Sequence, residues 1–302
     1  MHSGGNRWFD KSLQFIVTPN GQAGMNGEHS MMDGMPTTHL AGIVAGYRYE
    51  DASSEQTPSV PTIDQLDAND GIEDIFAKCH HVLATNPKIA TTIIQAKSDF
   101  QTLTEAHAIQ AKQFYGYGSN FMKANKFSPD AYVQMAMQLA TYRLFKEQVG
   151  TYEATQTRMF LHGRTEVSRA VSTESEAFVK AMGLHPHMSF QNKSQEIQQK
   201  VTLLRNAAAA HAKYTSQAAK GMGVDRHLFG LSQCVKDGEP MPDLLSHPLF
   251  VRSKHWRVST SHLTHPNFVN WGYVSFLFLD SYYIIYILEC RKNHSNPHST
   301  FL

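Results

Sequence analysis

Cysteine is scarce in this sequence, which has only three among 302 residues, at positions 79, 234 and 290. Cysteines at such wide spacing form neither a disulfide framework nor the paired motif of a cysteine metal site. The sequence therefore predicts no bound metal, and it favours a reducing compartment.

Charge of one sign is also lacking, because 27 Lys and Arg residues balance 26 Asp and Glu residues and leave a formal net charge of +1. Nucleic-acid binding depends on a clustered basic surface. We therefore expect no nucleic-acid partner, although a small basic site for one anionic ligand is compatible with this balance.

Targeting signals and long hydrophobic runs are missing as well. The first residues have no apolar signal core, and the last residues are not a peroxisomal tripeptide. Residues 274–290 are rich in Phe, Ile, Leu and Tyr, but Asp280 interrupts a stretch already shorter than the ~20 residues of a membrane span. A membrane anchor here is the less favoured interpretation, and the choice between mitochondrion, peroxisome and cytosol stays open.

The residue patterns that are present predict a mixed α/β protein. Buried or alternating runs predict strands at 13–17 and 256–260, with a strand-like piece at 106–114. A polar stretch at 49–61 reads as a linker. Helical spacing and helix-start signals predict helices at 39–47, 63–97 with a break near 87, 128–145, 173–182 and 194–221.

Seven short motifs follow one another along the chain. They are Asn6–Lys11, Gly27–Gly34, Lys126–Ala131, Thr151–Glu153, His162–Glu166, Asp225–Leu228 and Ser259–Ser261. In this order, over residues 6 to 273, the chain resembles the carnitine/choline acyltransferase family, although any one motif alone is weak.

The resemblance implies an α/β fold of the coenzyme A-dependent, chloramphenicol acetyltransferase-like type, with two domains and the active site between them. Family members are about twice as long, so the fold is expected to be partial and the chain to begin mid-protein. Residues 1–70 would be the last part of one domain and would contain the catalytic His. Residues 71–273 would form most of the second domain, and residues 274–302 would be a divergent tail.

The resemblance also assigns catalytic roles. His29 would act as general base, because an imidazole exchanges protons near neutral pH. Ser261 would donate a hydrogen bond to the oxyanion. Asp33, where the family usually has Glu, would support His29, or it is only an acidic residue at a helix start. An ordinary strand end is the other interpretation of Ser261.

Carnitine contacts follow from the same resemblance. Arg226 would hold the carnitine carboxylate in a two-pronged bond, with hydroxyls from Tyr152 and Thr165, and Ser259 would lie on the carnitine side. Choline has no carboxylate, so Arg226 with Thr165 favours carnitine.

Two observations qualify the expected carnitine site. Arg226 has an alternative interpretation as one half of a structural salt bridge with Asp225 or another acid. Position 154 is Ala where the family usually has Ser, which removes one expected hydrogen bond.

Coenzyme A would lie near a helix start that adds partial positive charge. Position 119 is Ser where many members have Lys, which would lower phosphate affinity. A bulky Trp271 would fill the acyl channel and favour acetyl or another short acyl group. The residues expected to contact coenzyme A are Lys123, Lys126, Ser128, Asp130 and His262, although two nearby Lys residues are also common on a solvated surface.

The function expected from the resemblance is reversible transfer of a short acyl group between coenzyme A and the hydroxyl of carnitine. Both are substrates, and no permanently bound cofactor is expected. We expect a monomer without firm membrane association. The alternatives are an inactive truncated acyltransferase and a membrane-tethered, non-enzymatic protein.

Overall fold

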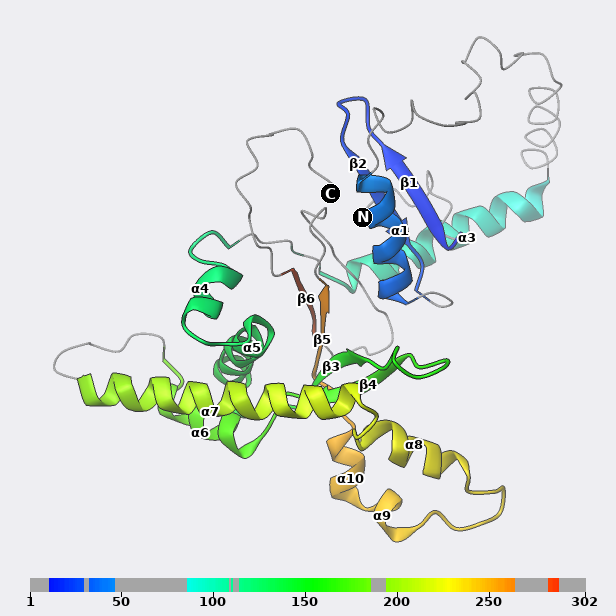
Figure 1. Ribbon diagram of the computed structural model, residues 1–302. Coiled ribbons are helices and arrows are strands. Elements are labelled where there is room, and N and C mark those ends of the chain that lie inside the picture. The colour runs from blue at the N-terminus through cyan, green and yellow to red at the C-terminus, as the bar shows by residue number, and fades with distance from the viewer. Residues whose placement is uncertain are drawn as a thin grey trace.

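The computed structural model describes residues 11–29, 33–46, 86–108, 110, 114–185, 194–263 and 282–287, with backbone alone at 45–46 and 282–287 (Figure 1). The chain is a mixed α/β protein with two small sheets. The predicted linker at 49–61 lies outside the described residues, as does the predicted helix before residue 86.

The N-terminal part is a hairpin followed by a helix. Strands β1 (Leu13–Val17) and β2 (Ala23–Gly27) pair antiparallel, with Leu13 opposite Gly27. The strand predicted at 13–17 is confirmed with the same bounds. Helix α1 (Gly34–Gly46) begins five residues before the predicted start at 39.

The second sheet has the strand order β4-β3-β5-β6. Strands β3 (Thr151–Gln156) and β4 (Thr165–Arg169) form an antiparallel hairpin. Strand β5 (Val258–Leu263) pairs parallel with β3, and β6 (Tyr282–Ile287) pairs parallel with β5. Parallel pairing requires a crossover connection, and the connection from the β3–β4 hairpin to β5 contains helices that pack on the sheet.

Three helices supply the main core on one face of this sheet (Figure 1). They are α5 (Pro129–Phe145), α6 (Thr173–Met182) and α7 (Ser194–Ala219). Met135, Val179 and Ala207 are completely buried where they pack together. The small Ala207 and Ala208 allow α7 to lie close to α5 and α6.

Helix signals in the sequence were reliable in this region. Ser128 caps α5, Pro129 is its first residue and Asp130 lies in its first turn, as predicted. Helix α6 has the predicted bounds, and α7 ends at Ala219, close to the predicted 221. The strand predicted at 256–260 is confirmed as β5, shifted to Val258–Leu263.

The strand-like piece at 106–114 is a wrong prediction. Helix α3 (Pro87–Glu105) runs past the predicted end at 97, and the described residues 106–108, 110 and 114 form no strand. The short helix α4 (Ser119–Ala124) then leads into α5. The apolar residues at 106–114 show no clear hydrophobic periodicity, so the sequence alone does not distinguish a strand from a loop there.

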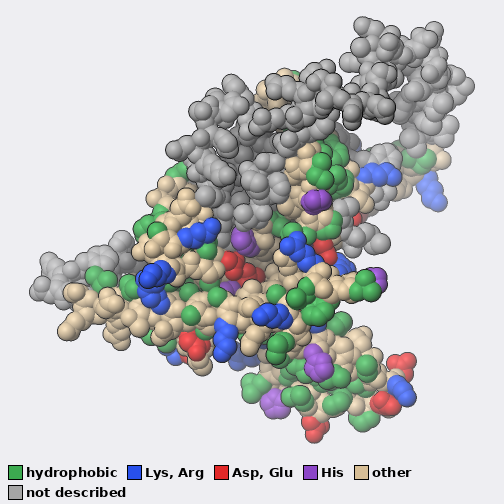
Figure 2. Space-filling model, in the orientation of Figure 1, with side chains coloured by type: hydrophobic (Ala, Val, Ile, Leu, Met, Phe, Trp, Pro, Cys, Tyr) green, Lys and Arg blue, Asp and Glu red, His purple; other side chains and the backbone are tan. Residues whose placement is uncertain are grey.

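The remaining helices form a lobe after α7: α8 (Asp225–Gln233), α9 (Asp243–Ser246) and α10 (Pro248–Ser253). Figure 2 shows hydrophobic side chains on the surface of this lobe. The large hydrophobic residues exposed there include Phe229, Leu244 and Leu249. Among the described helices, none is both long and apolar enough to cross a membrane. Part of the apolar stretch 274–290 is the strand β6.

Candidate functional site

The two faces of the four-stranded sheet carry different residues, because strand side chains alternate. Thr260 faces the helices, since Gln134 Nε2 of α5 donates to its Oγ1 at 2.9 Å. Leu263 faces the other way and lies against Gly34, at the start of α1. Alternation along β5 therefore puts Ser259 and Ser261 on the α1 side.

Arg226 and Thr165 lie together, as the resemblance predicted. Arg226 Nε donates to the Thr165 carbonyl oxygen at 3.0 Å, and its Nη2 lies 3.4 Å from Thr165 Oγ1. The alternative partner Asp225 is engaged elsewhere, because Arg169 holds it with bonds of 2.5 and 2.9 Å. The Arg226 side chain therefore bonds to Thr165, whereas Asp225 bonds to Arg169.

Glu166 explains why Arg226 is placed beside Thr165. Its buried carboxylate accepts from the backbone N–H of Arg226 at 3.2 Å, in the first turn of α8, where no N-cap side chain does so. Gly223 makes room for this contact, since a Cβ there would lie 2.3 Å from Glu166 Cγ. The acidic residue thus caps α8 and fixes its start against β4.

An open pocket of about 410 Å³ lies at this junction. Thr165, Glu166 and Arg226 line it, with Thr157, Phe160, Gly221, Gly223 and His227. A guanidinium, hydroxyl groups and one aromatic ring at a concave surface can hold a small ligand that carries a carboxylate.

Asp33 joins the segment that carries His29 to the same hairpin. Arg164 Nε and Nη2 bond to the two Asp33 carboxylate oxygens at 2.9 and 2.6 Å. These bonds, together with the charge of His29, hold the pKa of Asp33 below its usual value. Arg164 directly precedes Thr165, so the ion pair brings the start of α1 toward the pocket.

His29 itself is exposed and lies between β2 and α1. It is close enough to Asp33 to influence the pKa of that carboxyl. Its role as general base stays a prediction. The predicted acyl-channel residue Trp271 lies outside the described residues.

Tyr152 and Ser259 lie side by side in the parallel register of β3 and β5. The Tyr152 ring packs edge-on against Trp256, with centroids 5.8 Å apart, and Arg169 lies over the same Trp256 ring. Thr165 pairs with Gln156, four residues further along β3. Tyr152 and Thr165 are therefore on one face but at opposite ends of the hairpin, about 13 Å apart along the strand.

The predicted coenzyme A residues gather only in part. Asp130 Oδ1 lies 3.4 Å from His262 Nδ1, next to the helix cap Ser128. Lys123 lies in the last turn of α4, and Lys126 has a left-handed backbone conformation. Both side chains are exposed. The start of α5 thus combines a helix N-terminus with two nearby cations.

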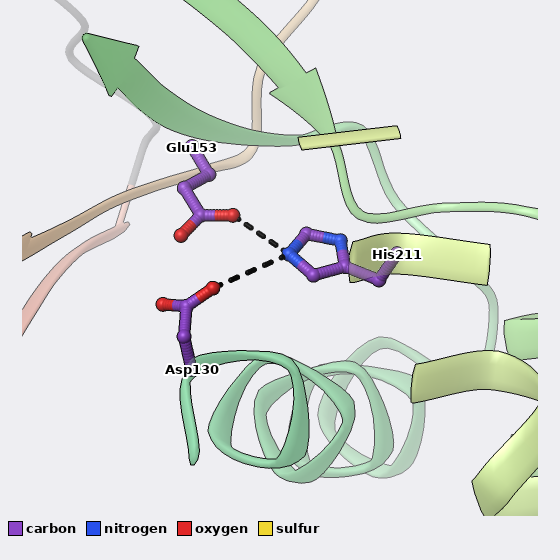
Figure 3. A group of neighbouring side chains, drawn as sticks. All are labelled: Asp130, Glu153 and His211. Atoms are coloured by element: carbon purple, nitrogen blue, oxygen red, sulfur yellow. Dashed lines mark ion pairs between the residues drawn. The ribbon is translucent and has the colours of Figure 1, made fainter. Parts of the chain in front are cut away.

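A buried cluster adjoins Asp130 on the helix-covered face (Figure 3). His211 Nε2 from α7 lies 2.8 Å from Glu153 Oε2 of β3 and 3.8 Å from Asp130 Oδ2, and all three side chains point toward one another. Burial lowers the pKa of His211, but the two carboxylates have the larger effect and raise this pKa to about 9. Burial raises the pKa of Glu153 and lowers that of His262.

Sequence reasoning did not single out His211, Glu153 or Glu166 as functional. Glu153 alternates with Thr151 and Thr155 on the buried face of β3, and this pattern indicates that the carboxylate is buried and needs a partner. His211 follows the small buried run Ala207–Ala208 on one helix face. Neither pattern says which partner lies opposite, because that depends on tertiary packing.

Comparisons with known proteins find similar sequences among named acyltransferases. Carnitine O-acetyltransferase, mitochondrial, of Saccharomyces cerevisiae is 36% identical over 277 residues, which cover 89% of this chain and 38% of the relative. Carnitine O-acetyltransferase of Mus musculus is 37% identical over 260 residues, or 85% of this chain and 38% of the relative.

Choline O-acetyltransferase of Rattus norvegicus is 32% identical over 265 residues, again 38% of the relative. The chain thus spans well under half the length of these relatives. The family model for choline/carnitine O-acyltransferase matches residues 1–300, which extends past Tyr273, where the sequence resemblance ended. On this match the chain belongs to the choline/carnitine O-acyltransferase family.

Proposed function

We propose that this chain carries an acyltransferase site that moves an acetyl or other short acyl group between coenzyme A and carnitine. The observation that carries the proposal is Arg226, held at the pocket by Thr165 and, through its backbone, by Glu166. Carnitine offers the carboxylate that such a guanidinium binds, and choline does not. Relatives named for both acceptors match this chain, so the acceptor is the point that needs testing.

The reaction needs one proton carrier. The imidazole of His29 takes the proton of the carnitine hydroxyl, and the alcohol oxygen attacks the thioester carbonyl. Ser261 donates a hydrogen bond to the resulting oxyanion. The carbon–sulfur bond then breaks, and the imidazolium returns its proton to the thiolate of coenzyme A. The Asp33–Arg164 pair anchors the start of α1 to the β3–β4 hairpin.

The test follows release of free thiol from acetyl-coenzyme A with carnitine or choline as acceptor. Carnitine is expected to be the better acceptor, and His29→Ala to abolish turnover. Arg226→Ala should raise KM for carnitine about ten- to a hundredfold, because one charge-assisted pair is worth ~1.5–3 kcal/mol. Arg252→Ala, an exposed site on α10, is the matched control and should change nothing.

A second candidate is a chain without activity of its own. Two observations favour it: His29 is exposed, and so are large apolar side chains such as Val17 and Leu161. A folded chain that releases no thiol with either acceptor would support this candidate and contradict the first.

A further inference from the structure

The buried cluster of Figure 3 is one end of a chain of charged and polar groups that reaches the surface. Side-chain exposure rises from 1% at His211 and 4% at Glu153 to 22% at Asp130 and 27% at His262. The inner two groups are shielded from solvent, whereas the outer two are accessible. A change at the inner end therefore acts on a ligand only through Asp130.

Two carboxylates close together repel each other, and Glu153 is buried where a lone charge is costly. His211 Nε2 lies within 4 Å of an oxygen of each, so a protonated ring offsets both charges. Its Nδ1 is buried and has no hydrogen-bond partner among the described residues, which is a cost of the protonated form. Attraction by two anions at 2.8 and 3.8 Å outweighs that cost.

His262 also lies beside Asp130, with its Nδ1 3.4 Å from Oδ1, but burial lowers the pKa of His262 whereas the pKa of His211 is raised, so His211 is the stronger cation of the two. Of the elements packed on α7, β4 brings Glu166 and Arg169, whose bonds run to α8. The charged residues of α6 lie on the surface, with Glu176 paired to Lys180. Thr215, one turn along α7, approaches His211 Nε2 to 3.4 Å and carries no charge.

We propose that His211 is a positioning residue for the coenzyme A side of the site: held between Glu153 and Asp130, it fixes the Asp130 carboxylate at the start of α5. This inference rests on the proposed function, in which Asp130 and His262 contact coenzyme A. An immobile carboxylate accepts N–H or O–H donors of that ligand more strongly than a mobile one. Carnitine, on the opposite face of the sheet, should be unaffected.

The test uses His211→Gln, which keeps a hydrogen-bonding side chain and removes the charge. Binding of acetyl-coenzyme A, measured by calorimetry without carnitine, should weaken about tenfold, as loss of charge assistance implies. KM for carnitine should stay unchanged. His255→Gln, an exposed histidine, is the matched control and should bind as the wild type does.

The pH dependence of binding separates positioning from a merely structural role. The pKa of His211 is about 9, so the wild type should bind acetyl-coenzyme A more weakly at pH 9.5 than at pH 7.5. Acetyl-coenzyme A has no free thiol to titrate in that range. The His211→Gln variant should show no such change.

A double variant, His211→Gln with Glu153→Gln, covers the case in which the single variant does not fold. It leaves no unpaired buried charge at position 153, so its melting temperature should return toward the wild-type value. Its binding should stay weak, because the ion pair with His211 that positions Asp130 is still missing. Recovery of both stability and binding would overturn the inference.

The remaining outcomes separate the inference from the proposed function. Weaker binding in His211→Gln, with no thiol release by the wild type, supports the inference and contradicts the function. Normal turnover by the wild type, with His211→Gln binding acetyl-coenzyme A like the wild type, supports the proposed function and contradicts the inference. Equal losses for both substrates in His211→Gln would also overturn the inference, and a wild type that does not bind acetyl-coenzyme A contradicts both.

Discussion

The two faces of the four-stranded sheet hold their charges in opposite ways. On the helix-covered face, His211 and Glu153 are buried and contact each other at 2.8 Å. On the other side, the Arg164–Asp33 pair is in solvent, with Arg164 66% exposed. Buried charges must be paired for the fold to survive, whereas exposed pairs contribute little stability and chiefly fix position. The same kind of ion pair thus serves stability on one face and geometry on the other.

The largest effect on stability should come from breaking the buried ion pair on the helix-covered face. His211→Ala leaves Glu153 buried without its cation, which typically costs ~3–5 kcal/mol of unfolding free energy. Urea titration followed by circular dichroism measures it. The double variant with both partners as Gln is the control and should lose much less. Equal losses in the two would mean that volume, and not charge, stabilises this face.

A pH series tests the same cluster without mutation. The folded pKa of His211, about 9, lies above its unfolded value, so the native state binds the extra proton between pH ~6.5 and ~9. The stabilisation is complete below that window and lost as the pH rises through it, by up to about 3 kcal/mol. The wild type should therefore unfold more easily at pH 9.5 than at pH 6.5, and His211→Gln should flatten the profile.

Gly223 contacts Glu166 where β4 meets the start of α8. A Cβ at position 223 would sit 2.3 Å from Glu166 Cγ, so Gly223→Ala should destabilise by ~1–3 kcal/mol and raise KM for carnitine by releasing Arg226. Gly230→Ala is the matched control on α8, where nothing lies within 4 Å of the added methyl. That variant should stabilise slightly, as Ala does in helices. A milder effect at 223 than at 230 would contradict the packing role of Gly223.

The smallest effect on stability should follow from breaking the exposed pair. Asp33→Asn should barely change unfolding at pH 7, because the pair is largely solvated. Because the pKa of Asp33 is lowered, the pair stabilises the fold at pH values above the usual pKa of Asp, and this stabilisation is lost as the pH falls through the lowered pKa. The small difference in stability between wild type and variant should therefore disappear in acid. Turnover should fall in Asp33→Asn and Arg164→Gln alike, and not further in the double variant. Additive losses would show that the two residues act separately.

Local sequence signals predicted much of the fold around the site. Ser128-Pro129-Asp130 marked the start of α5 because capping chemistry involves only neighbouring residues. The apolar run 13–17 and the helix 173–182 matched their elements in full. The segment 106–114 failed because a short apolar stretch without a clear period does not distinguish a strand from a loop.

The candidate site residues come from motif order, and their roles stay predictions. The resemblance placed Thr165 and Arg226 together, and the structure brings their side chains within 3.4 Å. It did not indicate that Arg164 bonds to Asp33, 131 residues away, or that Glu166 caps α8. These contacts join segments far apart in the chain, and no local pattern encodes which acid meets which base.

The sequence by itself determined the family, the strongest helix boundaries and the residue types available for acyl transfer, because these depend on motifs and short-range chemistry. Tertiary structure alone decided that His211 lies between Glu153 and Asp130, and that the start of α1 is tied to the β3–β4 hairpin. The physical reason is that ion pairing depends on distance and burial in three dimensions. Both quantities are set only when the helices pack on the sheet.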